Sequence, residues 1–177
     1  MALDAAKSVS PAISTELIDL AGMNLDPYLA VKVKSIDKED DFPALEVKLI
    51  APEVRGIIIG SPVYMGLVSS PCKAFMERCI SLRQAGFPLQ DKIGGAIAVG
   101  AGRNTGLELV LEQLVMFMLS QGMAVVGDGR PTSHWGGAVW AQKDEISGDE
   151  TGLTTVRGTG RHVAELALWL AAAPKPV

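Results

Sequence analysis

The stretch Gly56-Ile57-Ile58-Ile59-Gly60-Ser61-Pro62-Val63-Tyr64-Met65-Gly66 decides the fold of this chain. Its first part is a short apolar run, which is typical of a strand buried on both faces of a parallel sheet. The turn that follows leads into an apolar-patterned helix that begins near Ser70. Open α/β sheets bind ligands where the carboxyl end of a strand meets the start of a helix, because backbone N–H groups are unpaired there. Such turns also connect strands to helices in any α/β protein, so a ligand site and a purely structural turn are both open interpretations at this point.

Strands and helices alternate along the rest of the chain. We expect strands at Ile13–Ile18, Arg55–Gly60, Ile93–Val99 and Met123–Val126, and helices at Asp40–Ile50, Ser70–Arg83, Thr105–Gln121 and Leu153–Leu170. Thr105 and Glu108 are expected to form a capping box, residues 128–142 a loop, and residues 144–152 an exposed polar segment. Apolar strands separated by helices predict right-handed βαβ units, a parallel sheet with helices on both faces, and one domain over residues 1–177.

The composition argues against several classes of protein. Hydrophobic residues make up 48% and charged residues 20% of the 177 residues, which provides for a sizeable core. A formal net charge of −4 without a Lys/Arg cluster argues against a nucleic-acid partner. No apolar stretch reaches the ~20 residues of a membrane helix, and no signal peptide opens the chain. We therefore expect no membrane partner and a cytoplasmic location.

The two cysteines, Cys72 and Cys79, lie on one expected helix. Their spacing along a helix separates them by roughly 10 Å, whereas a disulfide needs Cα atoms within about 7 Å. We therefore expect two buried thiols without a mutual disulfide. No cluster of metal-ligating residues accompanies them, and His162 is expected to be structural, so we predict no metal site.

The expected helix Thr105–Gln121 carries more apolar side chains than one face of a sheet can cover. Either another subunit or the chain's own loops cover the remainder. We expect a homo-oligomer, a dimer or a tetramer, with Met116 and Phe117 at its interface.

Three ordered blocks resemble the flavodoxin-like NADPH-dependent FMN reductases, and their iron–sulfur flavoprotein branch in particular. The first block is Gly60-Ser-Pro-Val-Tyr-Met-Gly-Leu-Val-Ser-Ser-Pro-Cys-Lys-Ala-Phe-Met-Glu-Arg78. The second is Lys92-Ile-Gly-Gly-Ala-Ile-Ala-Val-Gly-Ala-Gly-Arg-Asn-Thr-Gly106, and the third is Gln121-Gly-Met-Ala-Val-Val-Gly-Asp-Gly129 followed by His134-Trp-Gly-Gly-Ala-Val-Trp140. The resemblance implies a flavodoxin-like three-layer sandwich and an oligomer that binds FMN near a subunit interface.

The resemblance also assigns the FMN site to two loops. The first would hold the isoalloxazine and ribityl parts, and the second would lie along the ring; their residues are Ser61, Pro62, Val63, Tyr64, Met65 and Gly66, then Gly100, Ala101, Gly102, Arg103 and Asn104. Glycines let backbone N–H groups approach a planar ring closely. Arg103 can stabilise a reduced anionic flavin, and Asn104 offers both a donor and an acceptor. A surface ion pair for Arg103 and a helix cap for Asn104 are the structural alternatives.

His134 and Trp135 are further candidates. If their loop folds over the flavin, Trp135 can stack on the ring and His134 can lie near the site of hydride transfer. The alternative is a turn histidine beside an aromatic residue, with no part in the chemistry. No other catalytic residue is assigned, because the flavin carries the redox chemistry.

Two departures from the family pattern bear on the site. Members begin with a strand and a Ser/Gly-rich loop that cradles the FMN phosphate, whereas this chain starts inside the following helix, so both are expected to be absent. In the strand order 2-1-3-4-5 the first strand is interior, and its neighbours would become unpaired edges. Iron–sulfur flavoproteins also carry a compact cysteine motif, which Asn24–Lys34 lacks, so no iron–sulfur cluster is expected.

The sequence therefore predicts an FMN-binding oxidoreductase. It would take hydride from NAD(P)H and pass electrons through the flavin to another flavin, a quinone or another acceptor, either a small molecule or a redox protein. Two other functions stay open: a flavin-binding electron carrier without appreciable NAD(P)H activity, and a flavin-free remnant with an interaction role.

Overall fold

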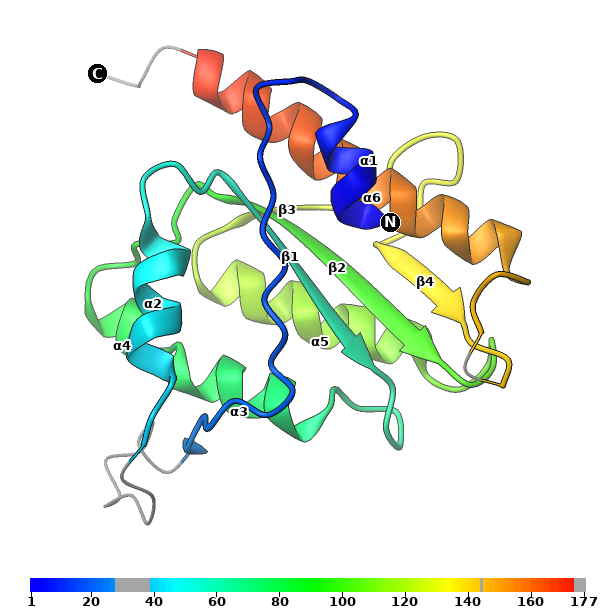
Figure 1. Cartoon of the computed structure of the whole chain (residues 1–177), viewed down its shortest axis with the longest axis horizontal. Helices are drawn as coiled ribbons and strands as arrows, with labels where there is room; N and C mark the ends of the chain where they lie inside the picture. The colour runs from blue at the N-terminus through cyan, green and yellow to red at the C-terminus, as the bar shows by residue number, and fades with distance from the viewer. Residues whose placement is uncertain (28–38, 144, 174–177) are drawn as a thin grey trace.

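Parallel strands form the sheet at the centre of the protein (Figure 1). The computed structural model describes residues 1–27, 39–143 and 145–173. β1 (Gly56–Pro62) pairs along its whole length with β2 (Ile93–Gly100). The other edge of β2 pairs first with β3 (Ala124–Val126) and then with β4 (Gly137–Trp140). All of these pairings are parallel, which confirms the predicted sheet, and within the described chain the far edge of β1 pairs with no strand.

Small residues on β2 let a helix approach each face of the sheet. A Cβ atom at Gly94 would lie 2.7 Å from the sulfur of Met118 on α5 (Leu107–Ser120), and one at Gly95 would lie 2.7 Å from Val163 on α6 (Glu150–Ala172). Neighbouring strand residues point to opposite faces, so α5 and α6 cover opposite faces of a three-layer sandwich. Figure 1 shows α5 crossing the sheet and α1 (Ala2–Lys7) lying alongside α6.

The larger apolar cluster lies on the α5 side of the sheet. It includes side chains from α2 (Phe42–Ile50), α3 (Ser70–Arg78) and α4 (Ile80–Gln84). The rings of Phe75 and Phe117 pack edge to face, with their centres 5.8 Å apart. Phe117 is therefore a core residue, and the expectation that it lies at a subunit interface is wrong. Met116 is 69% exposed and remains available for such a contact.

Cys72 and Cys79 are buried and free, as predicted. Burial raises the pKa of Cys72 to about 11, and burial raises the pKa of Cys79 even further above its ordinary value. Thiols of this kind are protonated at neutral pH, so both act as small apolar side chains.

The segment Ile13–Ile18 is not a strand. The described chain between α1 and residue 27 is an extended coil, and Ile18, Leu20 and Met23 pack as partly buried side chains against the larger core. The Glu16 carboxylate accepts a hydrogen bond of 2.5 Å from Lys48 on α2. Contact of one side with a core produces the same alternation of apolar and polar residues as a strand, without a hydrogen-bonded partner.

The two helices that flank the expected site begin or end differently from the prediction. The expected helix Ser70–Arg83 is broken at Cys79 into α3 and α4. The capping box at Thr105 and Glu108 does not form, because the Thr105 hydroxyl donates to the carbonyl of Gly102 and Gly106 is the N-cap of α5. Gly106 has a φ of 99°, a conformation that favours glycine.

The predicted loop over residues 128–142 contains a strand, and the predicted exposed segment, described from residue 145 on, is mostly exposed but contains one buried carboxylate. β4 lies inside the first of them, with Val139 buried at 2% exposure. Four residues between glycines and polar turns are too few for a strand pattern to be recognised. Asp149, only 1% exposed, is the N-cap of α6, and its carboxylate accepts a hydrogen bond of 3.0 Å from the Gly152 N–H. Asp144 lies outside the described residues.

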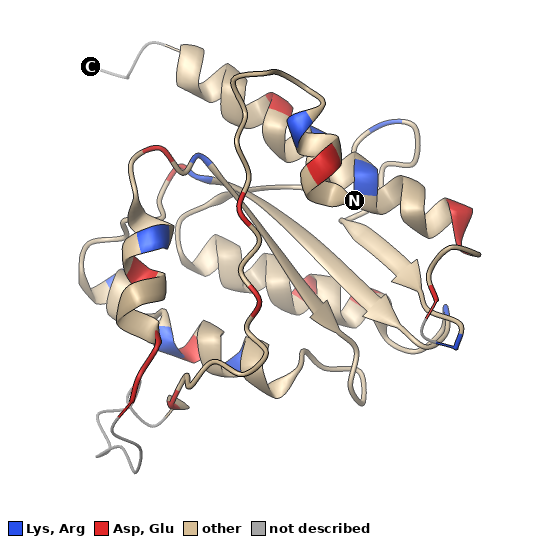
Figure 2. Cartoon of the chain, in the orientation of Figure 1, with Lys and Arg blue, Asp and Glu red and all other residues tan. Residues whose placement is uncertain are grey.

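Charged side chains lie on the helices and loops around the sheet. Figure 2 shows Lys and Arg interspersed with Asp and Glu, and all four strands free of either kind. Among the described helices, none is both long and apolar enough to span a bilayer.

An ion pair ties the chain before α2 to α3. The Arg78 guanidinium donates to both carboxylate oxygens of Asp40, at 2.6 and 2.8 Å, and lies 4.7 Å from the centre of the Phe42 ring. The side chains of Arg78 and Asp40 are 10% and 23% exposed. The Arg78 guanidinium holds the pKa of Asp40 below its ordinary value, because its hydrogen bonds outweigh the opposing effect of burial.

The substitution Asp40→Asn should lower the free energy of unfolding at pH 7 by about 1–3 kcal/mol, because it leaves a buried guanidinium without its counter-charge. The pKa of Asp40 is lower in the folded than in the unfolded protein. Its contribution should therefore be fully present above the unfolded pKa of about 3.9 and be lost as the pH falls through the folded pKa. Urea unfolding at a series of pH values measures both effects.

Glu77→Gln is the matched control, since Glu77 forms an exposed ion pair with Lys73 on the same helix. It should change the free energy of unfolding by less than about 0.5 kcal/mol. Equal stability of Asp40→Asn and the wild-type protein at pH 7 would contradict the assignment.

Candidate functional site

Two loops meet at the carboxyl edge of the sheet. The first follows β1 and the second follows β2, and Pro62 at the end of β1 lies opposite Val99 near the end of β2. The register therefore brings together every residue predicted for the site except His134 and Trp135. Ser61 and Pro62, expected in the turn, are the last residues of β1.

The first loop ends in a tight two-residue turn. The backbones of Tyr64 and Leu67 exchange two hydrogen bonds of 3.0 Å, and Met65 and Gly66 between them have φ angles of 53° and 77°. Two consecutive positive φ angles are typical of the tightest hairpin turns. The turn presents Tyr64 at 63% exposure and Met65 at 99% exposure, so both side chains point away from the core.

Ser61 and Val63 hold this loop in place. The Ser61 hydroxyl is buried, accepts a hydrogen bond of 2.9 Å from the Ser69 N–H and donates one of 2.9 Å to the Pro62 carbonyl. The Val63 N–H donates to the carbonyl of Val99 at 2.8 Å. Since these polar groups have partners within the protein, Ser61 and Val63 fix the conformation of the loop.

Gln113 on α5 is a positioning residue that the sequence interpretation missed. Its side-chain amide donates to the Gly66 carbonyl at 3.2 Å and accepts from the Val68 N–H at 3.3 Å. The second half of the turn and the residue after it are thereby fixed to α5. A glutamine in the middle of a helix carries no sequence signal for such a role.

The second loop turns its carbonyl groups inward. The carbonyls of Gly100, Ala101 and Gly102 accept hydrogen bonds from the Ala141 N–H at 2.7 Å, the Trp140 indole N–H at 2.9 Å and the Thr105 hydroxyl at 2.5 Å. The N–H groups of residues 101–104 find no hydrogen-bond acceptor among the described residues. The loop therefore offers donors at the edge of the sheet, where an electron-rich ligand would be favoured.

The two loops touch each other through glycine. A Cβ atom at Gly106 would lie only 2.9 Å from the Cα atom of Gly66, which is closer than a side chain tolerates. The absence of a side chain at Gly106 thus lets the loops meet at backbone distance.

Arg103 is exposed, but contacts with two other residues fix its side chain. Its guanidinium pairs with Asp149 and lies 5.7 Å from the centre of the Trp140 ring, while 54% of the Arg103 side chain faces solvent. Asn104 beside it is exposed. Burial alone would raise the pKa of Asp149, but the N–H groups of Gly152 and Trp140, together with Arg103, hold it below its ordinary value. The ion pair that the sequence left as an alternative for Arg103 is thus present.

His134 and Trp135 lie on the loop between β3 and β4. β4 begins opposite Ile97, so this loop rejoins the sheet roughly 10 Å before the carboxyl end of β2. Asp128, fully buried, accepts hydrogen bonds from the Thr132 hydroxyl and the His134 N–H, and fixes the loop. The flavin roles of His134 and Trp135 stay predictions.

His162 on α6 supports the start of the same loop. Its Nδ1 lies 2.9 Å from the carbonyl of Gly127, which fits the structural role predicted for it. In the part of the chain that the structure describes, no group of three His, Cys, Asp or Glu residues is placed to hold a metal ion.

Known proteins resemble this chain in sequence and in fold. The family described as NADPH-dependent FMN reductase matches residues 1–136. An iron-sulfur flavoprotein of Methanocaldococcus jannaschii is 42% identical over 159 residues, which cover 87% of this chain and 81% of the relative. An NAD(P)H dehydrogenase (quinone) of Chromohalobacter salexigens is 28% identical over 191 residues, covering 93% and 92%. The crystal structure of a flavodoxin, WrbA-like protein from Agrobacterium tumefaciens superposes with a TM-score of 0.57 at 28% identity, over 70% of this chain and 71% of that one, which confirms the flavodoxin-like fold.

Gly106→Ala should destabilise the protein by more than Gly86→Ala. Both glycines have positive φ angles, of 99° and 93°, but a Cβ atom at Gly86 would meet nothing within 4 Å. Both variants incur about 1–2 kcal/mol for the left-handed conformation, and Gly106→Ala should lose about 1–2 kcal/mol more as the two loops separate. Urea unfolding gives both values. Equal losses for the two variants would show that the loops do not depend on their contact.

Proposed function

The chain belongs to the NADPH-dependent FMN reductase family, and we propose that it binds FMN and passes electrons from NAD(P)H through the flavin to another flavin, a quinone or another acceptor. Family membership makes it a flavin-dependent oxidoreductase. The observation that carries the proposed site is the second loop, whose N–H groups at residues 101–104 find no acceptor among the described residues. The quinone as acceptor follows from the name of the Chromohalobacter relative.

The residues at the sheet edge fit an isoalloxazine ring. Such a ring needs donors for its carbonyl oxygens and nitrogens, and an apolar surface for its face. The N–H groups of residues 101–104 and the exposed amide of Asn104 supply donors, and the exposed Tyr64 supplies an aromatic surface. The Arg103 guanidinium supplies a positive charge that favours a reduced, anionic flavin. When FMN is bound, it supplies the hydride and electron chemistry.

We propose that electrons pass through flavin alone, without an iron–sulfur cluster. Clusters are held by four cysteine thiolates as a rule, whereas this chain has two cysteines. Both are buried thiols with raised pKa values on the α3 side of the sheet. Residues 28–34 of the segment where the relatives' cysteine motif was expected lie outside the described residues. The cytoplasmic location likewise stays a prediction.

We also propose a homo-oligomer built on the outer face of α5, with a second copy of this chain as the occupant. Leu109, Met116 and Leu119 lie at helical spacing on that face and are 54%, 69% and 56% exposed. The apolar surface continues onto the first loop, because a Cβ atom at Gly66 would lie 3.7 Å from Leu109. A second copy that covers α5 would therefore also reach the FMN loop.

Purified protein should retain a flavin absorption band after FMN is added and the excess is removed. Asn104→Ala and Tyr64→Ala should each raise the Kd for FMN about tenfold through the loss of a hydrogen bond or a stacking surface. The matched control is Trp169→Ala, an exposed aromatic residue on α6 that should leave the Kd unchanged. Unaltered FMN affinity in both site variants would contradict the assignment of the site.

Steady-state oxidation of NAD(P)H then separates the remaining functions. Turnover with a quinone or free flavin supports the oxidoreductase proposed above. Bound flavin without turnover would mean an electron carrier, and no flavin binding would mean a flavin-free remnant.

Met116→Glu should dissociate the oligomer, because it places a charge in the centre of an apolar interface. Size-exclusion chromatography with light scattering measures the mass. The control is Val47→Glu, since Val47 is 67% exposed on a different helix, α2. A monomeric wild-type protein, or an oligomer that survives Met116→Glu, would contradict the assigned interface.

A further inference from the structure

Asp149 is a buried carboxylate at which three parts of the chain meet. One oxygen accepts a hydrogen bond of 3.0 Å from the Gly152 N–H, and the other accepts one of 2.9 Å from the Trp140 N–H. The Arg103 guanidinium donates to the same carboxylate. The first turn of α6, the end of β4 and the loop after β2 are therefore joined through one side chain that is 1% exposed.

A helix cap alone does not require this residue. An N-cap needs one oxygen, which serine or asparagine provides as well as aspartate. A buried negative charge is costly unless an opposite charge and hydrogen bonds compensate for it. The ion-pair partner at Asp149 is Arg103, a residue of the loop assigned to FMN.

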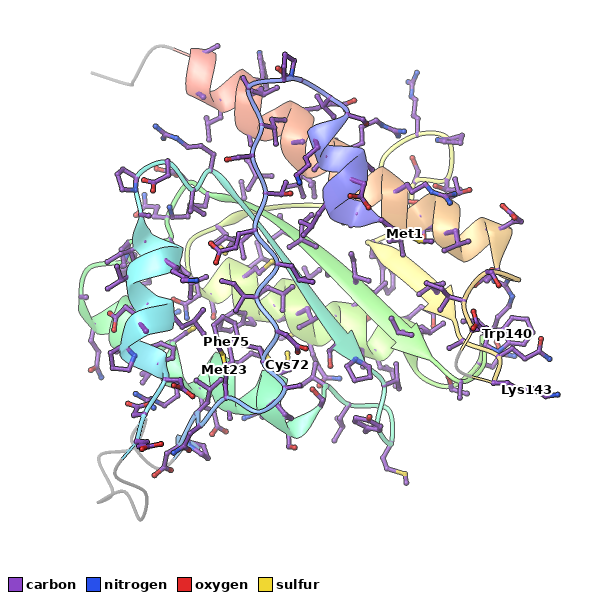
Figure 3. The ribbon with its side chains drawn as sticks, viewed as in Figure 1. Met1, Met23, Cys72, Phe75, Trp140 and Lys143 are labelled. Atoms are coloured by element: carbon purple, nitrogen blue, oxygen red, sulfur yellow. The ribbon has the colours of Figure 1, made fainter. Side chains whose placement is uncertain are left out.

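Trp140 holds the same loop from a second side. Its indole N–H donates to the Ala101 carbonyl at 2.9 Å, and its ring lies under the Arg103 guanidinium at 5.7 Å. Figure 3 shows Trp140 at the end of β4, far from Cys72 and Phe75. Arg103 is thus fixed between a carboxylate and an aromatic ring while 54% of its side chain stays exposed to solvent.

We propose that Asp149 is a positioning residue of the flavin site, which fixes the Arg103 guanidinium and the loop of residues 100–104 in the geometry that meets FMN. Trp140 completes this support. The inference rests on the proposed function. Without the Asp149 carboxylate, the Arg103 side chain turns into solvent and the loop loses its tie to α6.

A double-mutant cycle on the full chain tests this role. Asp149→Asn and Arg103→Met should each raise the Kd for FMN about tenfold, equivalent to about 1.4 kcal/mol. If Asp149 acts through Arg103, the double variant should bind FMN no more weakly than Arg103→Met alone. Fluorescence titration with FMN gives the four Kd values.

The midpoint potential of bound FMN separates positioning from simple charge. Removal of a negative charge by itself raises the potential, because the reduced flavin becomes easier to hold. Loss of a fixed Arg103 lowers the potential. The positioning role therefore predicts a lower potential in Asp149→Asn, in the same direction as Arg103→Met, and a rise would overturn it.

Two further variants control for the helix. Glu150→Gln also removes one negative charge, at the neighbouring position in the first turn of α6. It should change neither the Kd for FMN nor the midpoint potential. Asp149→Ser keeps a capping oxygen and should behave as Asp149→Asn does, which preserves the test if the asparagine variant folds poorly.

The outcomes distinguish the inference from its premise. A wild-type protein that binds no FMN would overturn the proposed function itself. A second outcome is that the wild-type protein binds FMN while Asp149→Asn weakens FMN binding by the same factor with Arg103 present or replaced. That result would support the proposed function but show that Asp149 is only a helix cap.

Discussion

The uninterrupted pairing of β1 with β2 is the constraint on which the site depends. Seven consecutive residue pairs are in register from Gly56 opposite Ile93 to Pro62 opposite Val99. The hydrogen bond from the Val63 N–H to the Val99 carbonyl extends the pairing one residue beyond β1. Parallel strands of equal register end at one level, so the two loops leave the sheet side by side and Gly66 can meet Gly106 at backbone distance.

The polarity of the second loop follows from which of its backbone groups have partners inside the protein. Three successive carbonyls accept hydrogen bonds from Ala141, Trp140 and Thr105, and this orients the intervening peptide planes. The N–H groups of residues 101–104, just before α5, find no acceptor among the described residues. An N–H group that loses water without gaining an acceptor costs about 1–3 kcal/mol, so this edge favours a planar ligand rich in acceptor atoms over an apolar one.

The sequence predicts the strands that build the sheet and the loops that form its edge, but not the residues that hold those loops. β1 and β2 are apolar runs bounded by glycine, so the local sequence is enough to predict both their position and their burial. β4 is only four residues long, and Asp149 lies in a predominantly polar stretch. Gln113 is of a residue type that is common on the solvent-exposed face of a helix. Each of these acquires its role through contacts between parts of the chain more than eight residues apart, which no local pattern records.

Two of the supporting residues, Trp140 and Asp149, also lie outside the part of the chain that the family match covers. The family match covers residues 1–136, which include both loops. In the proposed site the loops would supply the groups that face a flavin, and hydrogen bonds from the end of β4 and the start of α6 tie the second loop in place. On this proposal, changes in this last part of the chain would alter the position of Arg103, and with it the electrostatic field at the flavin, while every loop residue stays the same. In the proposed site, the residues that would contact the flavin and the residues that hold them in place therefore belong to different segments of the chain.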